Sequence, residues 1–86
     1  MDNLETKNNV KLLDTINSII KKEQDFSDED MSYITNTIIK EKNNVFYVRL
    51  HSADITMDFI IQNLFTKPSL IEVEFIDFDN DFTKIS

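Results

Sequence analysis

Apolar residues recur every three or four positions in the first quarter of the chain. The residues with this spacing are Leu12, Leu13, Ile16, Ile19 and Ile20, and they would share one side of a helix. Lys21 and Lys22 follow them, where a cation offsets the negative end of the helix dipole. The pattern predicts an amphipathic helix over residues 4–22.

A second helix is predicted to begin at Ser27 and to end near Lys42. Ser27 is a good N-cap, and three acidic residues follow it directly. Met31, Ile34 and Ile38 then repeat with helical spacing. Because the connection between the two helices is short, we expect them to form an antiparallel hairpin.

Two later segments, residues 45–51 and 70–78, alternate between apolar and polar positions as strands do. In the second segment the apolar residues occupy odd positions as far as Phe75, after which the alternation slips by one. That slip predicts either a bulge near residue 76 or a strand that leaves the core there.

The segment between these strands, residues 54–65, fits both a helix and a strand. Its length and the stop at Pro68 favour a helix. The predicted class is α+β, with an N-terminal antiparallel helix hairpin packed on a small sheet in the order α-α-β-α-β. If residues 54–65 form a strand, the order becomes α-α followed by a β-meander. A chain of 86 residues is expected to form a single compact domain over residues 1–86.

Glycine and cysteine are both absent from the sequence. Without glycine, turns that need a positive φ must use Asn or Asp, and Asn43-Asn44 marks such a turn. The lack of glycine also excludes a phosphate-binding loop. Without cysteine, neither a disulfide framework nor a thiolate metal site can form.

The N-terminus has neither the basic nor the apolar region of a signal peptide, and no apolar run could cross a bilayer. We therefore predict a cytoplasmic protein of a bacterium or of a phage-infected host cell, with no membrane contact.

The formal net charge of −7 is concentrated in two short segments, residues 23–31 and residues 70–86. Such clusters repel nucleic acid and attract basic surfaces. The predicted partner-binding residues are Glu72, Glu74, Asp77, Phe78, Asp79, Asp81 and Phe82 in the C-terminal cluster, and Asp25, Asp28, Glu29 and Asp30 in the N-terminal one. In the alternative interpretation, the first cluster only caps a helix, and Phe78 and Phe82 only complete the core.

The sequence offers little for catalysis or metal binding. Residues 77–81 resemble the start of a calcium loop, but Phe82 occupies the position that requires glycine. His51 is the only histidine, and no second base accompanies it. Glu72 and Glu74 could act as acid and base only inside a cleft, which so small a domain seldom encloses. We predict a protein that is not an enzyme and that has no cofactor or metal.

These features predict a small acidic inhibitor that binds a partner protein and occludes its basic, nucleic-acid-binding surface. Ile and Asn are abundant, with twelve and nine copies, whereas Ala, Arg and Pro occur once each, a usage that suggests an AT-rich coding genome. In size, charge clustering and this codon bias the chain resembles phage-encoded inhibitors as a class, including anti-CRISPR proteins, which implies a nucleic-acid mimic of a phage or mobile element. The alternative is a non-enzymatic regulatory or structural interaction module, such as an antitoxin, an immunity protein or a small homodimer. Such a module would use apolar contacts and would depend little on salt.

Overall fold

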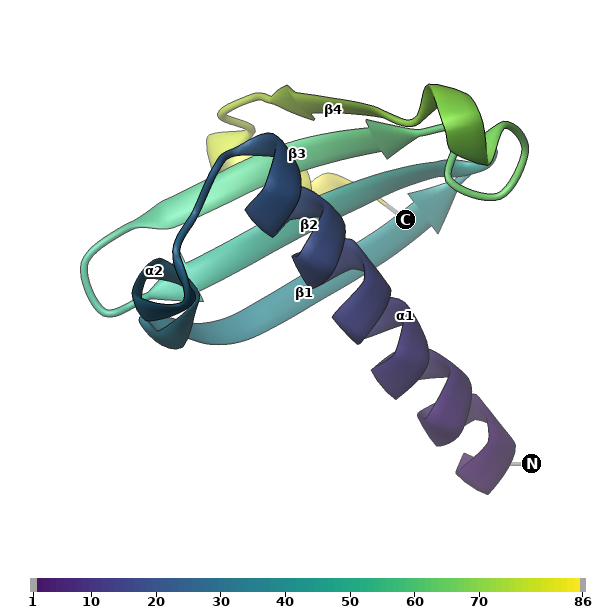
Figure 1. Cartoon of the computed structure of the whole chain (residues 1–86), viewed down its shortest axis with the longest axis horizontal. Coiled ribbons are helices and arrows are strands. Elements are labelled where there is room, and N and C mark those ends of the chain that lie inside the picture. The colour runs from purple at the N-terminus through teal and green to yellow at the C-terminus, as the bar shows by residue number, and fades with distance from the viewer. Residues whose placement is uncertain (1, 86) are drawn as a thin grey trace. The chain divides into compact units, whose positions relative to one another are not determined.

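The computed structural model describes residues 2–85, with side chains from Lys11 onward. The chain divides into two compact units, unit 1 (Met1–Ser32) and unit 2 (Tyr33–Ser86). Unit 1 contains two helices, and unit 2 contains an antiparallel sheet with two short 3-10 helices (Figure 1). The expectation of a single domain stays a prediction.

Helix α1 (Asp2–Glu23) confirms the first predicted helix. Ile16 and Ile20, from its apolar stripe, are fully buried. The helix ends at Glu23, and Asp25, two residues later, has a φ of 56°. The N–H of Phe26 donates to the carbonyl of Lys21, and the N–H of Asp25 donates to that of Lys22. This pair of bonds is a Schellman motif with aspartate in the place usually taken by glycine.

Helix α2 (Asp28–Ser32) begins at the predicted N-cap. The hydroxyl of Ser27 accepts the N–H of Asp30, and the carboxylate of Asp30 accepts the N–H of Ser27. This reciprocal pair is a capping box in which aspartate replaces the usual glutamate. The helix nevertheless ends after five residues.

The predicted second helix over residues 27–42 is therefore wrong, and so is the helix hairpin. Strand β1 (Ile34–Lys42) occupies most of that segment. Its β-branched residues are Ile34, Thr35, Thr37, Ile38 and Ile39. Branching at Cβ disfavours a helix and suits a pleated sheet. Pairing with the following strand along most of β1 then outweighs the weak helical spacing.

The sheet of unit 2 is a four-stranded meander in the order β1-β2-β3-β4, and all its neighbouring strands are antiparallel (Figure 1). Strand β2 (Val45–Ser52) confirms the first predicted strand. Strand β4 (Glu72–Phe75) confirms the centre of the last one, and the chain leaves the sheet where the alternation slips.

Strand β3 (Thr56–Gln62) replaces the helix that we preferred for residues 54–65. The order α-α-β-α-β is therefore wrong, and a helix hairpin packed on a sheet does not describe this chain. The protein does contain both helix and sheet. The 3-10 helices η1 (Pro68–Leu70) and η2 (Asp79–Lys84) flank β4.

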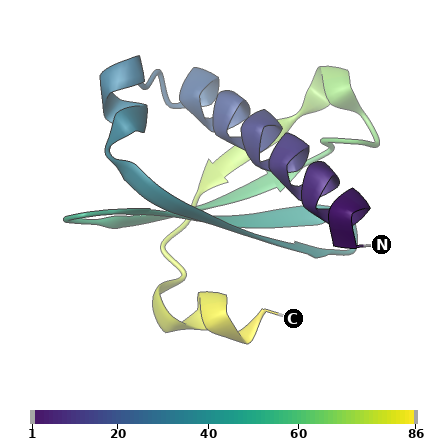
Figure 2. The same ribbon diagram turned by 90° about the horizontal axis from the view of Figure 1, so that it is seen from below.

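The register of the strands gives the sheet two different faces. The apolar face carries Phe46, Val48, Leu50, Met57, Phe59, Ile61, Val73 and Phe75. The opposite face, here called the ion-pair face, carries Lys40, Tyr47, Arg49, Asp58, Ile60, Glu72 and Glu74. The C-terminal residues that include η2, coloured yellow, lie beside the ion-pair face (Figure 2).

Every described residue with a positive φ is Asn or Asp, as the lack of glycine predicts. Asn43 and Asn44, with φ of 54° and 65°, connect β1 to β2. Positive φ at both central residues is the signature of a type I′ hairpin turn. The turn therefore uses the residue type that tolerates this conformation best after glycine.

We expect Asn44→Gly to raise the free energy of unfolding by a few tenths to about 1 kcal/mol, and Asn44→Ala to lower it by about 1 kcal/mol. Alanine has no polar side chain to offset the left-handed conformation. Urea denaturation followed by circular dichroism measures both changes. The control is Asn80→Ala, at an exposed asparagine outside the positive-φ set. Equal effects of alanine at positions 44 and 80 would contradict the turn assignment.

Candidate functional site

The ion-pair face takes its name from Arg49 and Asp58, which lie directly opposite each other on β2 and β3. The Nε atom of Arg49 donates to Oδ1 of Asp58 over 2.7 Å, and Nη2 donates to Oδ2 over 2.9 Å. The Asp58 side chain is only 2% exposed and that of Arg49 only 13%. This bidentate geometry, with its hydrogen bonds to Asp58, raises the pKa of Arg49 above its usual value. Arginine therefore stays charged at any working pH.

The same two side chains hold the start of the C-terminal segment. Oδ2 of Asp58 also accepts the N–H of Phe78 over 3.0 Å. Arg49 donates to the carbonyl of Asp79, and its guanidinium carbon lies 4.5 Å from the centre of the Phe82 ring. A cation at this distance over an aromatic face is attracted to it. The ion pair therefore joins two strands and fixes the chain that follows β4.

Lys40 holds the end of the same segment. Its Nζ atom donates to the carbonyls of Phe82, Thr83 and Ile85 over 3.1, 3.4 and 2.9 Å. These carbonyls lie at the C-terminal end of η2, where a cation is most favourable. The segment from residue 78 to residue 85 is thus bound at both ends.

The two aromatic residues predicted as partner anchors contact their own sheet. Phe82 is 2% exposed and belongs to the core. Phe78 is half-buried, and its ring lies 5.8 Å from that of Tyr47 and 6.4 Å from that of Phe82. The structure therefore gives both rings a packing role, the alternative that the sequence left open.

The five acidic residues of the C-terminal cluster are exposed. We call them the C-terminal acidic surface, and its members are Glu72, Glu74, Asp77, Asp79 and Asp81. Glu72 and Glu74 lie on the ion-pair face, which is also the face that the C-terminal segment covers. Glu72 and Glu74 therefore share a face of the sheet with the segment that bears Asp79 and Asp81, and Asp77 lies in the chain between them.

This surface is partly neutralised within the described part of the chain. Asp81 lies 3.7 Å from Lys84, at a distance where two exposed charges interact weakly. Asp77 accepts the N–H of Asp79, which orders the turn without adding positive charge. None of the ion pairs between described residues includes Glu72, Glu74, Asp77 or Asp79. Arg49 attracts Asp77 and Asp79 as well as Asp58, so this cation partly offsets those two carboxylates, whereas Glu72 and Glu74 have no ion-pair partner among the described residues.

The acidic residues of the N-terminal cluster have roles in the fold of unit 1. Asp25 occupies the left-handed position after α1, and Asp30 forms the capping box of α2. Asp28 lies 2.7 Å from Nζ of Lys21, and Glu29 accepts the hydroxyl of Ser32 with its carbonyl. Capping therefore accounts for Asp25 and Asp30, and an ion pair for Asp28. Its role in partner binding stays a prediction.

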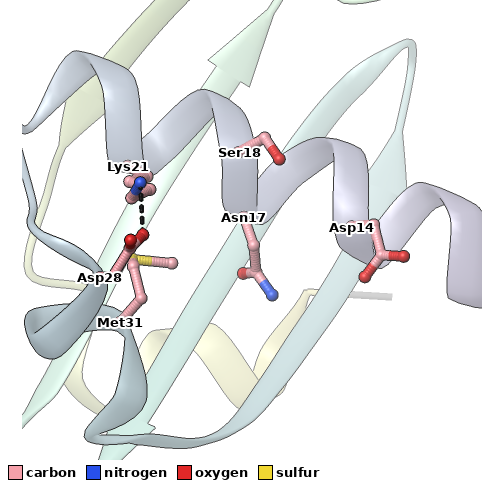
Figure 3. A pocket seen from close by; sticks show the side chains of 6 residues that line it. All are labelled: Asp14, Asn17, Ser18, Lys21, Asp28 and Met31. Carbon is pink, nitrogen blue, oxygen red and sulfur yellow. Dashed lines mark ion pairs between the residues drawn. The ribbon is translucent and has the colours of Figure 1, made fainter.

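The Lys21–Asp28 ion pair lies at one end of an open pocket in unit 1 of about 330 Å³ (Figure 3). The other residues that line it are Asp14, Asn17, Ser18 and Met31. Figure 3 shows Lys21 and Asp28 pointing toward each other and Asp14 lying away from them. The pocket combines ordinary polar side chains without a nucleophile and base in contact.

The hydrogen bond and the charge of Lys21 lower the pKa of Asp28 below its ordinary value. A lowered carboxylate pKa stabilises the fold above the unfolded-state pKa, and this contribution is lost as the pH falls through the folded-state pKa. We expect the Asp28 carboxyl resonance, followed by NMR from pH 6 to pH 2, to titrate below the ordinary aspartate range. In Lys21→Met the midpoint should move up to the ordinary aspartate range. An unchanged midpoint in that variant would contradict the ion pair.

The side chains of His51 and Ser52 form hydrogen bonds within the connection between β2 and β3. The Nδ1 atom of His51 is hydrogen-bonded to the hydroxyl of Thr56 over 3.2 Å. The hydroxyl of Ser52 donates to the carbonyl of Ile55 and accepts the N–H of that residue. Among the described side chains, no three metal-binding groups come together.

Sequence reasoning missed the residues that hold this site together, namely Lys40, Arg49 and Asp58. The sequence did contain one indication of the pairing between Arg49 and Asp58. Arg49 is the only arginine, and Asp58 interrupts an apolar run in the neighbouring segment. A charged residue at each of two inward strand positions indicates an ion pair across the strands.

No helix among residues 2–85 has both the length and the apolar character of a membrane span. No protein-family model matches the chain, and neither does any curated protein or solved structure with which it was compared.

Proposed function

We propose that the chain is a small, non-enzymatic inhibitor that binds a partner protein through its C-terminal acidic surface and occludes a basic groove of that partner. The groove is one that ordinarily binds nucleic acid, so that the carboxylates take the place of backbone phosphates. The setting would be the cytoplasm of a bacterium or a phage-infected cell, with the protein acting against host defence.

One observation carries this proposal. Glu72 and Glu74 lie on the face of the sheet that the C-terminal segment covers, and that segment, which bears Asp79 and Asp81, is bound by Arg49, Asp58 and Lys40. A charged surface that is already ordered loses less conformational entropy on binding than a mobile tail. The arrangement therefore suits recognition of a fixed pattern of positive charge.

A decalysine peptide is a defined substitute for a basic groove. We expect isothermal titration to show binding whose affinity falls at least about tenfold as the salt concentration rises from about 20 to about 200 mM, because salt screens exposed charges. A decaglutamate peptide is the control and should not bind. Binding of decalysine that does not change with salt, or no binding at low salt, would contradict the proposal.

A second function, an apolar interaction module such as a homodimer, is favoured by a different observation. Several large apolar side chains of unit 2 are exposed, namely Tyr33, Ile55, Phe65, Leu70 and Phe75. Exposed apolar surface of this kind marks contact sites in some proteins. Sedimentation at rising protein concentration separates the two functions, because a dimer would form without a cationic ligand and would tolerate salt.

A further inference from the structure

Strand β4 lies at one end of the sheet and pairs only with β3. The N–H of Ile76 donates to the carbonyl of Asp58. Hydrogen-bonded positions alternate along an antiparallel pair, so Glu72 and Glu74 also direct their backbone groups toward β3. The N–H and C=O groups of Val73 and Phe75 therefore point outward, where another strand could pair with them.

The two outer strands of the sheet differ in how they resist such pairing. Strand β1 has an irregular register between Ile34 and Asn36, and it carries Lys40 and Lys42. Irregular pairing and lysines are common protections of a free strand. Strand β4 has neither, although it is only four residues long and carries Glu72 and Glu74, and Phe75 on it is 59% exposed. The edge of β4 is the more open of the two.

A strand that pairs with the outer edge of β4 would need different side chains on its two faces. On the apolar face, Phe75 is exposed beside Val73. On the ion-pair face, Glu72 and Glu74 are exposed, and Asp77 follows them. Residues opposite each other on neighbouring strands share a face. A segment complementary to this edge has apolar residues opposite positions 73 and 75 and basic residues opposite positions 72 and 74.

We propose that the outer edge of β4 binds an extended segment of a partner protein in which basic and apolar residues alternate. This proposal rests on the proposed function and adds the conformation and the residue pattern of the partner segment. Backbone hydrogen bonds to Val73 and Phe75 give affinity, and the alternation of basic and apolar side chains in the partner segment gives specificity, as in other cases of strand addition.

The charge of β4 also disfavours antiparallel pairing with the β4 strand of a second copy. When the outward-pointing groups of two β4 strands pair in antiparallel fashion, odd positions lie opposite odd ones and even positions opposite even ones. Glu72 and Glu74 would then oppose the same glutamates of the other copy. Like charges directly opposite are destabilising. A cationic strand removes this repulsion.

The test compares two capped hexapeptides of the same composition, one in which lysine and valine alternate and one in which three lysines precede three valines. We expect the alternating peptide to bind on the order of tenfold more tightly, because only it can pair its backbone while matching both faces. It should also slow hydrogen exchange of the Val73 and Phe75 amides.

Two variants isolate the backbone contribution. Val73→Pro removes an outward N–H that β3 does not use, which an outer strand tolerates. Val73→Thr keeps that N–H and is the matched control. We expect the preference for the alternating peptide to persist in the threonine variant and to disappear in the proline variant. If the proline variant does not fold, the hydrogen exchange of the wild-type Val73 and Phe75 amides decides whether the peptide binds by strand addition.

The outcomes separate this inference from the proposed function. Equal, salt-sensitive binding of both hexapeptides, with unchanged amide exchange at Val73 and Phe75, would overturn strand addition and leave the proposed function standing. No binding of either hexapeptide or of decalysine would overturn both.

Discussion

Asp58→Ala should lower the free energy of unfolding by about 3–5 kcal/mol, the usual cost of breaking a buried ion pair by removing one partner. Arg49 would remain almost buried without its bidentate counterion, since its side chain is 13% exposed. The N–H of Phe78 would lose its acceptor as well. A domain of this size is stable by roughly 4–13 kcal/mol, so the variant should be partly or wholly unfolded. Urea denaturation followed by circular dichroism measures the loss.

Two comparisons keep this prediction specific. Asp54→Ala removes an exposed aspartate from the turn before β3 and should change stability by less than about 0.5 kcal/mol. The double variant Arg49→Met, Asp58→Leu replaces the ion pair with apolar side chains and should be more stable than Asp58→Ala. A loss for Asp58→Ala of less than about 1 kcal/mol would show that the ion pair does not hold the sheet and the C-terminal segment together.

The second large effect concerns binding. The triple variant Glu74→Gln, Asp77→Asn, Asp79→Asn should weaken binding of a cationic ligand about tenfold or more at low salt. Each exposed charge pair contributes roughly 0.2–1 kcal/mol, and three are lost together. The fold should remain intact, because asparagine tolerates the positive φ at position 79 and can still accept the hydrogen bond that Asp77 accepts.

The matched control is Glu41→Gln, Asp14→Asn, Asp54→Asn, which removes the same number and types of exposed carboxylates elsewhere. Both triple variants have the same net charge, so a general effect of charge would weaken binding equally in the two. We expect the control to lose less than about threefold in affinity. Equal losses would mean that position on the molecule does not matter, contrary to the proposed function.

The parts of the fold that could be predicted depend on local patterns. The stripe of α1, the cap at Ser27, the turn at Asn43-Asn44 and the strand β2 all follow from neighbouring residues. The two segments that were predicted wrongly, β1 and β3, form strands because they pair with β2, which no pattern within either segment shows. Met31, Ile34 and Ile38 have helical spacing, but pairing with β2 decides the conformation there.

Strand β3 shows the same limit more sharply. As a strand it must bury Asp58, which makes sense only when Arg49 lies opposite it. No pattern within residues 54–65 contains that information. The candidate site was predictable as a run of acidic residues, whereas the contacts of Arg49 and Lys40 that order it come from the tertiary structure.

The central claim is that a cationic partner docks on the C-terminal acidic surface, and a nuclear magnetic resonance map of the binding site tests it most directly. Titration of the nitrogen-15-labelled protein with decalysine at low salt should shift the amide signals of residues 72–81 most, with the amides around Asp14, Glu41 and Asp54 nearly unchanged. Shifts spread evenly over the chain, or largest outside residues 72–81, would contradict the account.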